Sequence, residues 1–287
     1  MSTPSILIYD IDGTLMKQHL NAFHSTRTVD CRKYEQQIAK YIPNDSNMVN
    51  ILRATIDVQT PKGFHISFYG SGDFHHLTLM QLQRLTKPFH LIVFDHHYDT
   101  GTFRFKKTNE IEYDFSSWVY SAAHLEYCTG ITMVGVNTGF FKEIFQDVRY
   151  LKKNFNFKVI SKKEEITSSY KEALKEIDPE IDVFLSIDKD VLNEDIVITD
   201  WDAGLMSDNQ LFECLLNSAT YFGKNIIGVD VCGEARRLGS LYTPEEKQKN
   251  IAKHSYVNQA IIKLLLNYLR YTDDRSSWDS LETDLFK

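Results

Sequence analysis

The sequence predicts an α/β fold in which a mainly parallel β-sheet lies between two layers of helices, a three-layer α/β/α sandwich. Short apolar runs recur along the chain, and longer stretches with apolar residues at helical spacing separate most of them. This alternation favours parallel strands, because a crossover helix brings the chain back for each parallel neighbour. Acidic and histidine residues directly follow two of the apolar runs. Parallel α/β sheets bind their ligands at that end of the strands.

Six apolar runs are predicted to be strands. They are continuous rather than alternating, which is typical of strands that are covered on both faces. They lie at residues 6–9, 64–69, 91–94, 131–136, 183–187 and 226–229. Helices are predicted at residues 77–85, 118–125, 142–151, 164–177 and 208–216, where the apolar residues have helical spacing. A long final helix at 243–271 is expected to pack outside the sheet.

The chain is interpreted as one domain that spans residues 1–287. Its length of 287 residues and hydrophobic content of 43% are sufficient for one large core. The segment 17–55, rich in His, Arg and Asn, is interpreted as an insertion that covers one edge of the sheet, and the polar tail at 273–287 as loosely ordered. A homo-oligomer is compatible with these features.

Charge and cysteine content argue against several functional classes. A net charge of −7 disfavours a nucleic-acid partner, because such binding depends on clustered Lys and Arg. The first apolar run lacks a preceding basic segment and is followed by Asp10 and Asp12, which argues against a signal peptide or a membrane anchor. Four cysteines without a CxxC pair indicate reduced thiols and hence a cytoplasmic protein, rather than a disulfide framework or a zinc knuckle.

Two clusters of potential metal ligands follow the third and fifth predicted strands. The sequence DHHYD occupies residues 95–99, and DKD occupies 188–190. Alternate residues leaving a strand point to the same side, so side chains at a spacing of two converge. The predicted ligands are Asp95, His97, Asp99, Asp188 and Asp190. Carboxylates with imidazole suit hard or borderline ions such as Mn²⁺, and bridging carboxylates permit two ions about 3.5–4 Å apart.

These motifs resemble those of the ureohydrolase superfamily, the arginase and agmatinase group, in the same order over nearly the whole chain. The DAHxD motif of that group resembles DHHYD at 95–99, its SxDxD motif matches SIDKD at 186–190, and its GGDH motif resembles GSGDFH at 70–75. The resemblance implies an arginase-like sandwich that holds two Mn²⁺ ions. It assigns one ion to a first-motif histidine, Asp95, Asp99 and Asp188, and the other to Asp95, His97, Asp188 and Asp190, with Asp95 and Asp188 as bridges.

The first motif departs from the pattern of the superfamily. Its histidine usually follows the GGD aspartate directly, but Phe74 occupies that position here. Either His75 or His76 must therefore supply the ligand, and His75 is predicted. The structural alternative for His75 is a surface histidine at the start of a helix.

Catalytic and substrate-binding positions follow from the resemblance with further changes. Glu234 is predicted to hold the guanidinium group of the substrate, although it lies one residue later than usual, and Asp230 is an alternative contact. The structural alternative for Glu234 is an ion pair with Arg236 or Arg237 on the surface. Asp99 is expected to orient the attacking hydroxide by hydrogen bonding. The proton-shuttle histidine has no clear counterpart. His124 is the nearest candidate, with a place on a helix surface or in the core as the alternative.

The resemblance implies hydrolysis of a guanidino group to urea and an amine. Within the superfamily it extends to the peptide arginases, which convert arginine side chains of a peptide to ornithine. The residues with which free-arginine enzymes read the amino and carboxylate groups are not identifiable at 101–115. The segments 100–115 and 17–55 are instead expected to shape an open groove, so an arginine side chain within a peptide is the preferred substrate.

Two other functions compete with this interpretation. The sequence DIDGT at 10–14 resembles the first motif of haloacid dehalogenase-like phosphatases, in which Asp10 would be the nucleophile and Asp12 the acid/base with Mg²⁺. That function leaves both later acidic clusters unexplained, and a polar turn with Gly13 is the structural alternative. A non-catalytic binding protein with a degenerate metal site is the third possibility. Unpaired buried carboxylates argue against it, because they are costly without cations.

Overall fold

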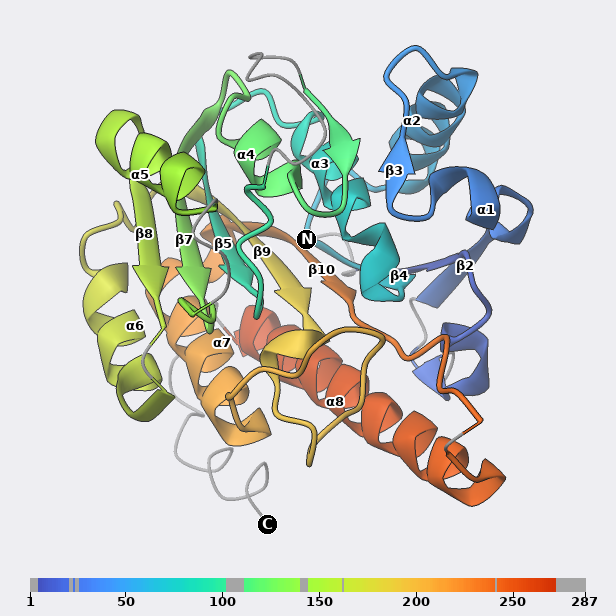
Figure 1. Ribbon diagram of the computed structural model, residues 1–287. Helices are drawn as coiled ribbons and strands as arrows, with labels where there is room; N and C mark the ends of the chain where they lie inside the picture. Colours follow the sequence, from blue (N-terminus) through green and yellow to red (C-terminus); the bar gives the residue numbers. More distant parts are fainter. Residues whose placement is uncertain are drawn as a thin grey trace.

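The computed structural model describes residues 5–20, 23, 26–101, 111–139, 144–161, 163–240 and 242–271 (Figure 1). Its centre is an eight-stranded sheet in which every neighbouring pair is parallel. In spatial order the strands are β2 (Thr26–Asp30), β1 (Ser5–Asp10), β4 (His65–Gly70), β10 (Ile226–Cys232), β9 (Asp182–Asp188), β5 (Phe89–Phe94), β7 (Cys128–Val134) and β8 (Phe157–Ile160). The predicted α/β class with a parallel sheet is confirmed.

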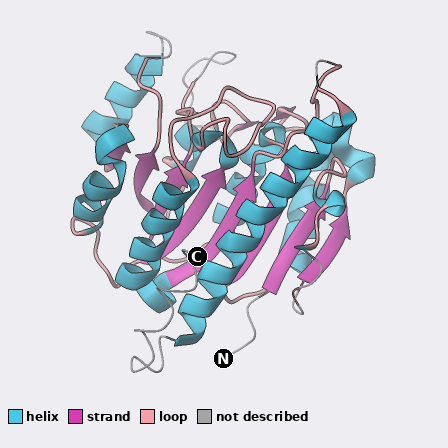
Figure 2. Cartoon of the chain, turned by 90° about the horizontal axis from the view of Figure 1, so that it is seen from below, coloured by secondary structure: helices cyan, strands magenta, loops and turns pink. Residues whose placement is uncertain are grey.

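Helices cover both faces of this sheet and create two hydrophobic cores. One face carries α6 (Ile166–Leu174), α7 (Asp208–Phe222) and α8 (Pro244–Tyr271), and Figure 2 shows long helices lying across the sheet. The other carries α2 (Asn47–Gln59), α3 (Thr78–Leu82), α4 (Trp118–Ala122) and α5 (Ile144–Asn154). Ile8 belongs to the first core and Leu7 to the second. Successive strand residues thus face opposite layers, which explains why the runs are apolar throughout.

All six predicted strands are present, and two further strands lie at the edges of the sheet. β2 is largely exposed and β8 is only four residues long, so neither produces an apolar run. The described part of residues 17–55 contains β2, α1 (Glu35–Ile38), β3 (Tyr41–Ile42) and the beginning of α2. Short 3-10 helices occupy Leu15–Lys17, Arg32–Tyr34, Gly72–Leu77, Lys163–Glu165, Lys189–Val191 and Gly223–Asn225. The single domain and the insertion remain predictions, and the tail at 273–287 lies outside the described residues.

The sheet order places four strand ends side by side. β4, β10, β9 and β5 are consecutive neighbours, so the loops that follow them meet at the carboxyl edge of the sheet. The loop after β4 needs a glycine, because Gly70 has a φ of +88° and a Cβ there would lie 2.7 Å from an Asp12 carboxylate oxygen. β3 pairs with β6 (Tyr113–Asp114) and joins the segment 17–55 to the residues that follow the DHHYD motif.

No helix among the described residues is both long enough and apolar enough to cross a membrane.

Candidate metal centre

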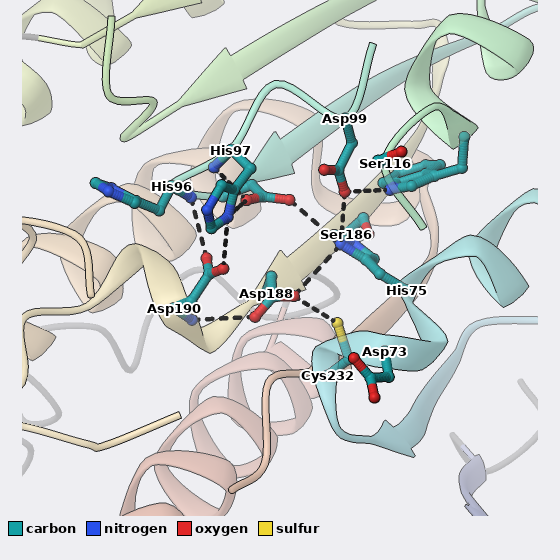
Figure 3. A network of polar contacts seen from close by, with 12 residues as sticks. Asp73, His75, His96, His97, Asp99, Ser116, Ser186, Asp188, Asp190 and Cys232 are labelled. Atoms are coloured by element: carbon teal, nitrogen blue, oxygen red, sulfur yellow. Dashed lines mark hydrogen bonds and ion pairs between the residues drawn. The ribbon is translucent and has the colours of Figure 1, made fainter. Parts of the chain in front are cut away.

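The six predicted metal ligands meet at the carboxyl ends of β4, β5 and β9 (Figure 3). Their ligand atoms form overlapping groups, and within each group all atoms lie within 4.8 Å of one another. The groups in the described part of the chain are His75 with Asp95 and Asp99, His75 with Asp188 and Cys232, and Asp95 with His97 and Asp190. Because His75 and Asp95 each belong to two groups, the three groups form one continuous centre. His76 is buried but belongs to none of them.

At one end of the centre, the imidazole of His75 faces three carboxylates. Its Nδ1 lies 3.3 Å from Asp95, 3.5 Å from Asp188 and 3.6 Å from Asp99. Neither this nitrogen nor the facing Asp95 Oδ2 makes a hydrogen bond, although both are buried. Buried polar atoms rarely lack partners, so this convergence of lone pairs fits a cation between them.

A short hydrogen-bond chain orients His75. Its Nε2 lies 2.9 Å from the Ser186 hydroxyl, which in turn donates to Asp230 Oδ1 at 2.7 Å. The Ser186 hydroxyl donates its hydrogen to Asp230, so its oxygen must accept a hydrogen bond from His75 Nε2–H. The other ring nitrogen of His75, Nδ1, therefore faces the carboxylates. Metal-binding histidines are typically held in this way through their second nitrogen. Asp230, predicted as a substrate contact, is fully buried behind this chain.

At the other end, His97 approaches Asp190. Its Nδ1 lies 2.9 Å from Asp190 Oδ2 and 3.7 Å from Asp95 Oδ1. Backbone amides hold the two carboxylates, because His97 N–H donates to Asp95 at 2.6 Å and His96 N–H donates to Asp190 at 3.1 Å. Burial opposes a charge on His97, yet the two carboxylates raise its pKa to about 12.

The carboxylates crowd one another in the absence of a cation. Burial, with the neighbouring Asp190, raises the pKa of Asp188 to about 7. Burial and the charge of Asp95 raise the pKa of both Asp99 and Asp190 to about 6. Burial acts on Asp95 too, but its contacts with the two histidines outweigh it and lower its pKa. Divalent ions would neutralise this excess charge, and the donor set of carboxylates and imidazoles suits Mn²⁺.

Asp99 is held in a conformation that non-glycine residues rarely adopt. Its φ is +46°, and its Oδ2 accepts a 2.8 Å hydrogen bond from the Trp118 indole. The same indole lies against His75, with ring centroids 4.5 Å apart. Trp118 therefore braces ligands from two loops. The sequence predicts only that Trp118 begins a helix, because its contact with Asp99 depends on how α4 packs over the DHHYD loop.

Glu234 lies in a buried network next to the centre rather than in any of the described ligand groups. Its carboxylate forms an ion pair with the fully buried Lys189 and accepts hydrogen bonds of 2.8 Å from both Asn258 and Gln18. Burial raises its pKa, but Lys189 and His254 lower it more, so the net shift is downward. Lys189 lies between two predicted ligands, and the network thus connects the DKD loop to α8. The guanidinium-binding role of Glu234 stays a prediction.

His124 makes its described contacts away from the ligand groups. Its Nδ1 lies 2.8 Å from the Tyr120 carbonyl oxygen, and the two rings are 4.6 Å apart. The side chain is partly exposed just beyond the end of α4. These contacts are those of a helix-end histidine, and its role as proton shuttle stays a prediction.

The aspartates of the N-terminal DIDGT sequence organise a turn. Asp10 accepts a 3.0 Å hydrogen bond from Gly13 N–H and pairs with Arg32. Asp12 accepts from the backbone and hydroxyl of Thr14 and, at 3.0 Å, from Ser71 N–H. Asp12 thus braces the first-motif loop beside β4. These contacts correspond to the polar turn, and the phosphatase interpretation is not favoured.

Aromatic residues and a lysine form the rim beside His97. The Trp201 and His97 rings are 6.1 Å apart, and Trp201 stacks on Phe115 at 5.1 Å. Lys40 Nζ lies 4.6 Å from the centre of the Trp201 ring. A cavity of about 250 Å³ is lined by Trp201, Lys40, Asp73, Asp200, Arg237 and Tyr242 among others. Because Trp201 lines the cavity and its ring also contacts His97, the cavity is adjacent to the His97 end of the centre.

Comparisons with known proteins found a family match, a relative and solved structures of the same fold. Residues 11–232 match the model of the arginase family. An uncharacterised protein of Thermotoga maritima is 27% identical over 257 residues, which cover 88% of this chain and 89% of that protein. The formimidoylglutamase of Bacillus subtilis superposes with a TM-score of 0.63 at 13% identity, covering 94% of this chain and 88% of the other. The agmatine ureohydrolase of Thermoplasma volcanium superposes with a TM-score of 0.61 at 14% identity, covering 95% of this chain and 92% of the other. The family match spans most of the chain, and the protein therefore belongs to the arginase family.

Proposed function

We propose that this protein is a binuclear manganese hydrolase that cleaves the C–N bond of a guanidino group to give urea and an amine. Members of the arginase family are metal-dependent C–N hydrolases. The observation that carries the proposal is the convergence of two imidazoles and four carboxylates on one site that has excess buried negative charge. When bound, two ions lower the pKa of water enough to supply hydroxide at neutral pH.

The residues of this chain position the reactants around that site. Asp99, which the Trp118 indole holds in place, orients the hydroxide by hydrogen bonding. The Asp230–Ser186–His75 chain fixes the imidazole that faces three of the carboxylates. Glu234 binds the guanidinium group, which requires that it exchange its present partner Lys189 for the substrate.

An arginine side chain within a peptide is the proposed substrate, with ornithine as the product residue. Its support is the rim beside His97, where the cavity lined by Trp201 and Lys40 offers space next to the centre. The pairing of β3 with β6 brings the segment 17–55 to this side of the molecule, as an open groove would require. A cytoplasmic location remains part of the proposal.

The experiment that tests the function is urea release by the Mn²⁺-loaded protein. Free arginine, agmatine and an arginine-containing peptide would be compared, with metal content measured on the same sample. The proposal expects about two Mn²⁺ per chain and urea release that is fastest with the peptide. Asp95→Ala is the control that removes a shared ligand and should abolish both metal binding and urea release.

The outcomes separate the remaining alternatives. Two bound ions with no urea from any of the three substrates would exclude guanidino hydrolysis and direct the assay to other C–N substrates such as formimidoylglutamate. Failure to bind metal would instead support the non-catalytic binding protein. Faster release from free arginine than from the peptide would reject only the choice of substrate.

A further inference from the structure

Cys232 lies at the junction of two strands that carry the metal centre. It is the last residue of β10, which runs between β4 and β9 in the sheet. In the sheet register Cys232 is the partner of Asp188 on one side and of Gly70 on the other. The register therefore directs its side chain to the place where the first-motif loop and the DKD loop meet.

The sulfur of Cys232 is within reach of two predicted ligands. It lies 3.3 Å from Asp188 Oδ2, and its sulfur belongs to the same 4.8 Å group as His75 Nδ1 and the Asp188 carboxylate (Figure 3). The residue is only 1% exposed. All four cysteines lie in the described part of the chain, and Cys232 alone among them joins a ligand group there.

A packing role alone does not account for this position. A buried cysteine that only fills space normally lies among apolar side chains, as Cys214 does in the core formed by α7. Cys232 also belongs to a core, the second one, but its sulfur in addition lies within 4.8 Å of an imidazole nitrogen and a carboxylate oxygen. The neighbouring Gly233 is also confined, because a Cβ there would lie 2.4 Å from Asp188 Oδ1. The backbone of this turn thus packs directly against the ligands.

We propose that the Cys232 sulfur is a ligand of the metal ion at the His75 end of the centre. The inference rests on the proposed binuclear function and adds a soft donor to an otherwise oxygen- and nitrogen-rich site. On binding, the sulfur supplies an electron pair to the ion, and the thiol proton passes to the solvent. The donors grouped at this end are then His75, Asp188 and Cys232, and His75 also faces Asp95 and Asp99. Thiolate favours Zn²⁺ or Co²⁺ over Mn²⁺, so the two ends of the centre differ in metal preference.

Cobalt substitution tests the inference without reference to activity. The full-length protein would be stripped with chelator, titrated with Co²⁺, and followed by absorption in the near ultraviolet, where sulfur-to-cobalt charge transfer is intense. The wild type is expected to show this band. Cys232→Ser is expected to lose it and to bind Co²⁺ about tenfold more weakly or worse, since even partners of metal ligands contribute about that much. Cys214→Ser is the matched buried control and should retain both band and affinity.

The possible results distinguish failure of the inference from failure of the function. Binding of about two Co²⁺ per chain without the band would overturn the cysteine ligand and leave the binuclear centre intact. No Co²⁺ binding by the wild type would overturn both. If Cys232→Ser misfolds, the wild type can be titrated with Cd²⁺ instead. A sulfur ligand gives a strong cadmium–thiolate absorption band, whereas a site with only oxygen and nitrogen ligands does not, so absence of the band would overturn the cysteine ligand.

Discussion

At the scale of single residues, the ligands predictable from the sequence are those that lie together in it. Asp95, His97 and Asp99 repeat at a spacing of two after an apolar run, and this pattern alone indicates convergence. Cys232 has no such local pattern, and Ser186, although it begins the SIDKD sequence, has no role that its position in the motif predicts. Their roles depend on the register of β10 against β9, which brings together residues that are 44 positions apart in the chain.

The orienting role of Ser186 gives a residue-scale prediction. Ser186→Ala removes the hydrogen bond that holds His75 Nε2, so Mn²⁺ affinity should fall by about 10- to 100-fold while the protein stays folded. Isothermal titration with Mn²⁺ measures the change. Ser218→Ala is the matched control, because Ser218 is also fully buried and hydrogen-bonded, but to Tyr170. An unchanged affinity in Ser186→Ala would remove Ser186 from the centre.

The excess charge of the centre gives a prediction of pH dependence. The pKa of His97 is raised to about 12 and that of His75 is also raised, so both stabilise the metal-free fold fully only below the unfolded value of about 6.5. Burial raises the pKa of Asp188 to about 7, so the metal-free fold is also more stable when Asp188 is protonated. The contributions of the two histidines decline as the pH rises above about 6.5, whereas that of Asp188 declines mainly between about pH 4 and about pH 7. The urea concentration at the midpoint of unfolding of the chelated protein should therefore decrease as the pH is raised from about 7 to about 9.

Two comparisons check that explanation. Saturating Mn²⁺ should flatten or reverse the decline, because bound cations take over the role of the protons. His124→Asn should leave the decline unchanged in chelated protein, since His124 makes its contacts outside the centre. A midpoint that rises with pH in chelated protein would contradict the charge assignment.

At the scale of elements, the central strands were predictable and the edge strands were not. Central strands such as β5 and β9 are buried on both faces and so leave continuous apolar runs. β2 is largely exposed and lies within the polar segment 17–55 that is interpreted as an insertion. The predicted helices are present with shifted ends; α3, for example, begins at Thr78, after the 3-10 helix Gly72–Leu77 that contains His75. The helices α1 and α2 were not predicted, because they begin within the segment 17–55 that is interpreted as an insertion.

The link between the β9 loop, the β10 loop and α8 gives an element-scale prediction. Lys189→Met leaves the buried Glu234 carboxylate without its cation and should destabilise the chelated protein by about 3–5 kcal/mol. The double variant Lys189→Met with Glu234→Gln should recover most of that lost stability, because neither charge of this ion pair remains. Denaturant unfolding measures both. Equal destabilisation by the single and double variants would show that the ion pair is not coupled.

At the scale of the whole molecule, the sequence predicted the layers and the location of the site, since both follow from strand–helix alternation and from polar residues at strand ends. It did not predict the buried partners of Glu234. The resemblance implies that Glu234 binds the guanidinium group, which stays a prediction, and the fold pairs Glu234 with Lys189 and with α8, an element that begins ten positions later in the chain. Buried ion pairs of this kind are specified only by tertiary packing.

The arrangement of ligands on loops at one edge of a fully parallel sheet predicts where metal removal acts. All strands of this sheet except the edge strands β2 and β8 are paired on both sides and lie between two cores, so their amide protection should not depend on the ions. The ligand loops hold like charges together and should open when the ions leave. Hydrogen exchange of chelated against Mn²⁺-loaded protein should therefore differ at residues 70–77, 95–101 and 188–192, and much less within β5 and β9. Asp95→Asn, which removes a shared ligand charge, should show little response to Mn²⁺. A loss of protection spread evenly over the sheet would mean that the metal centre stabilises the whole fold rather than its carboxyl edge.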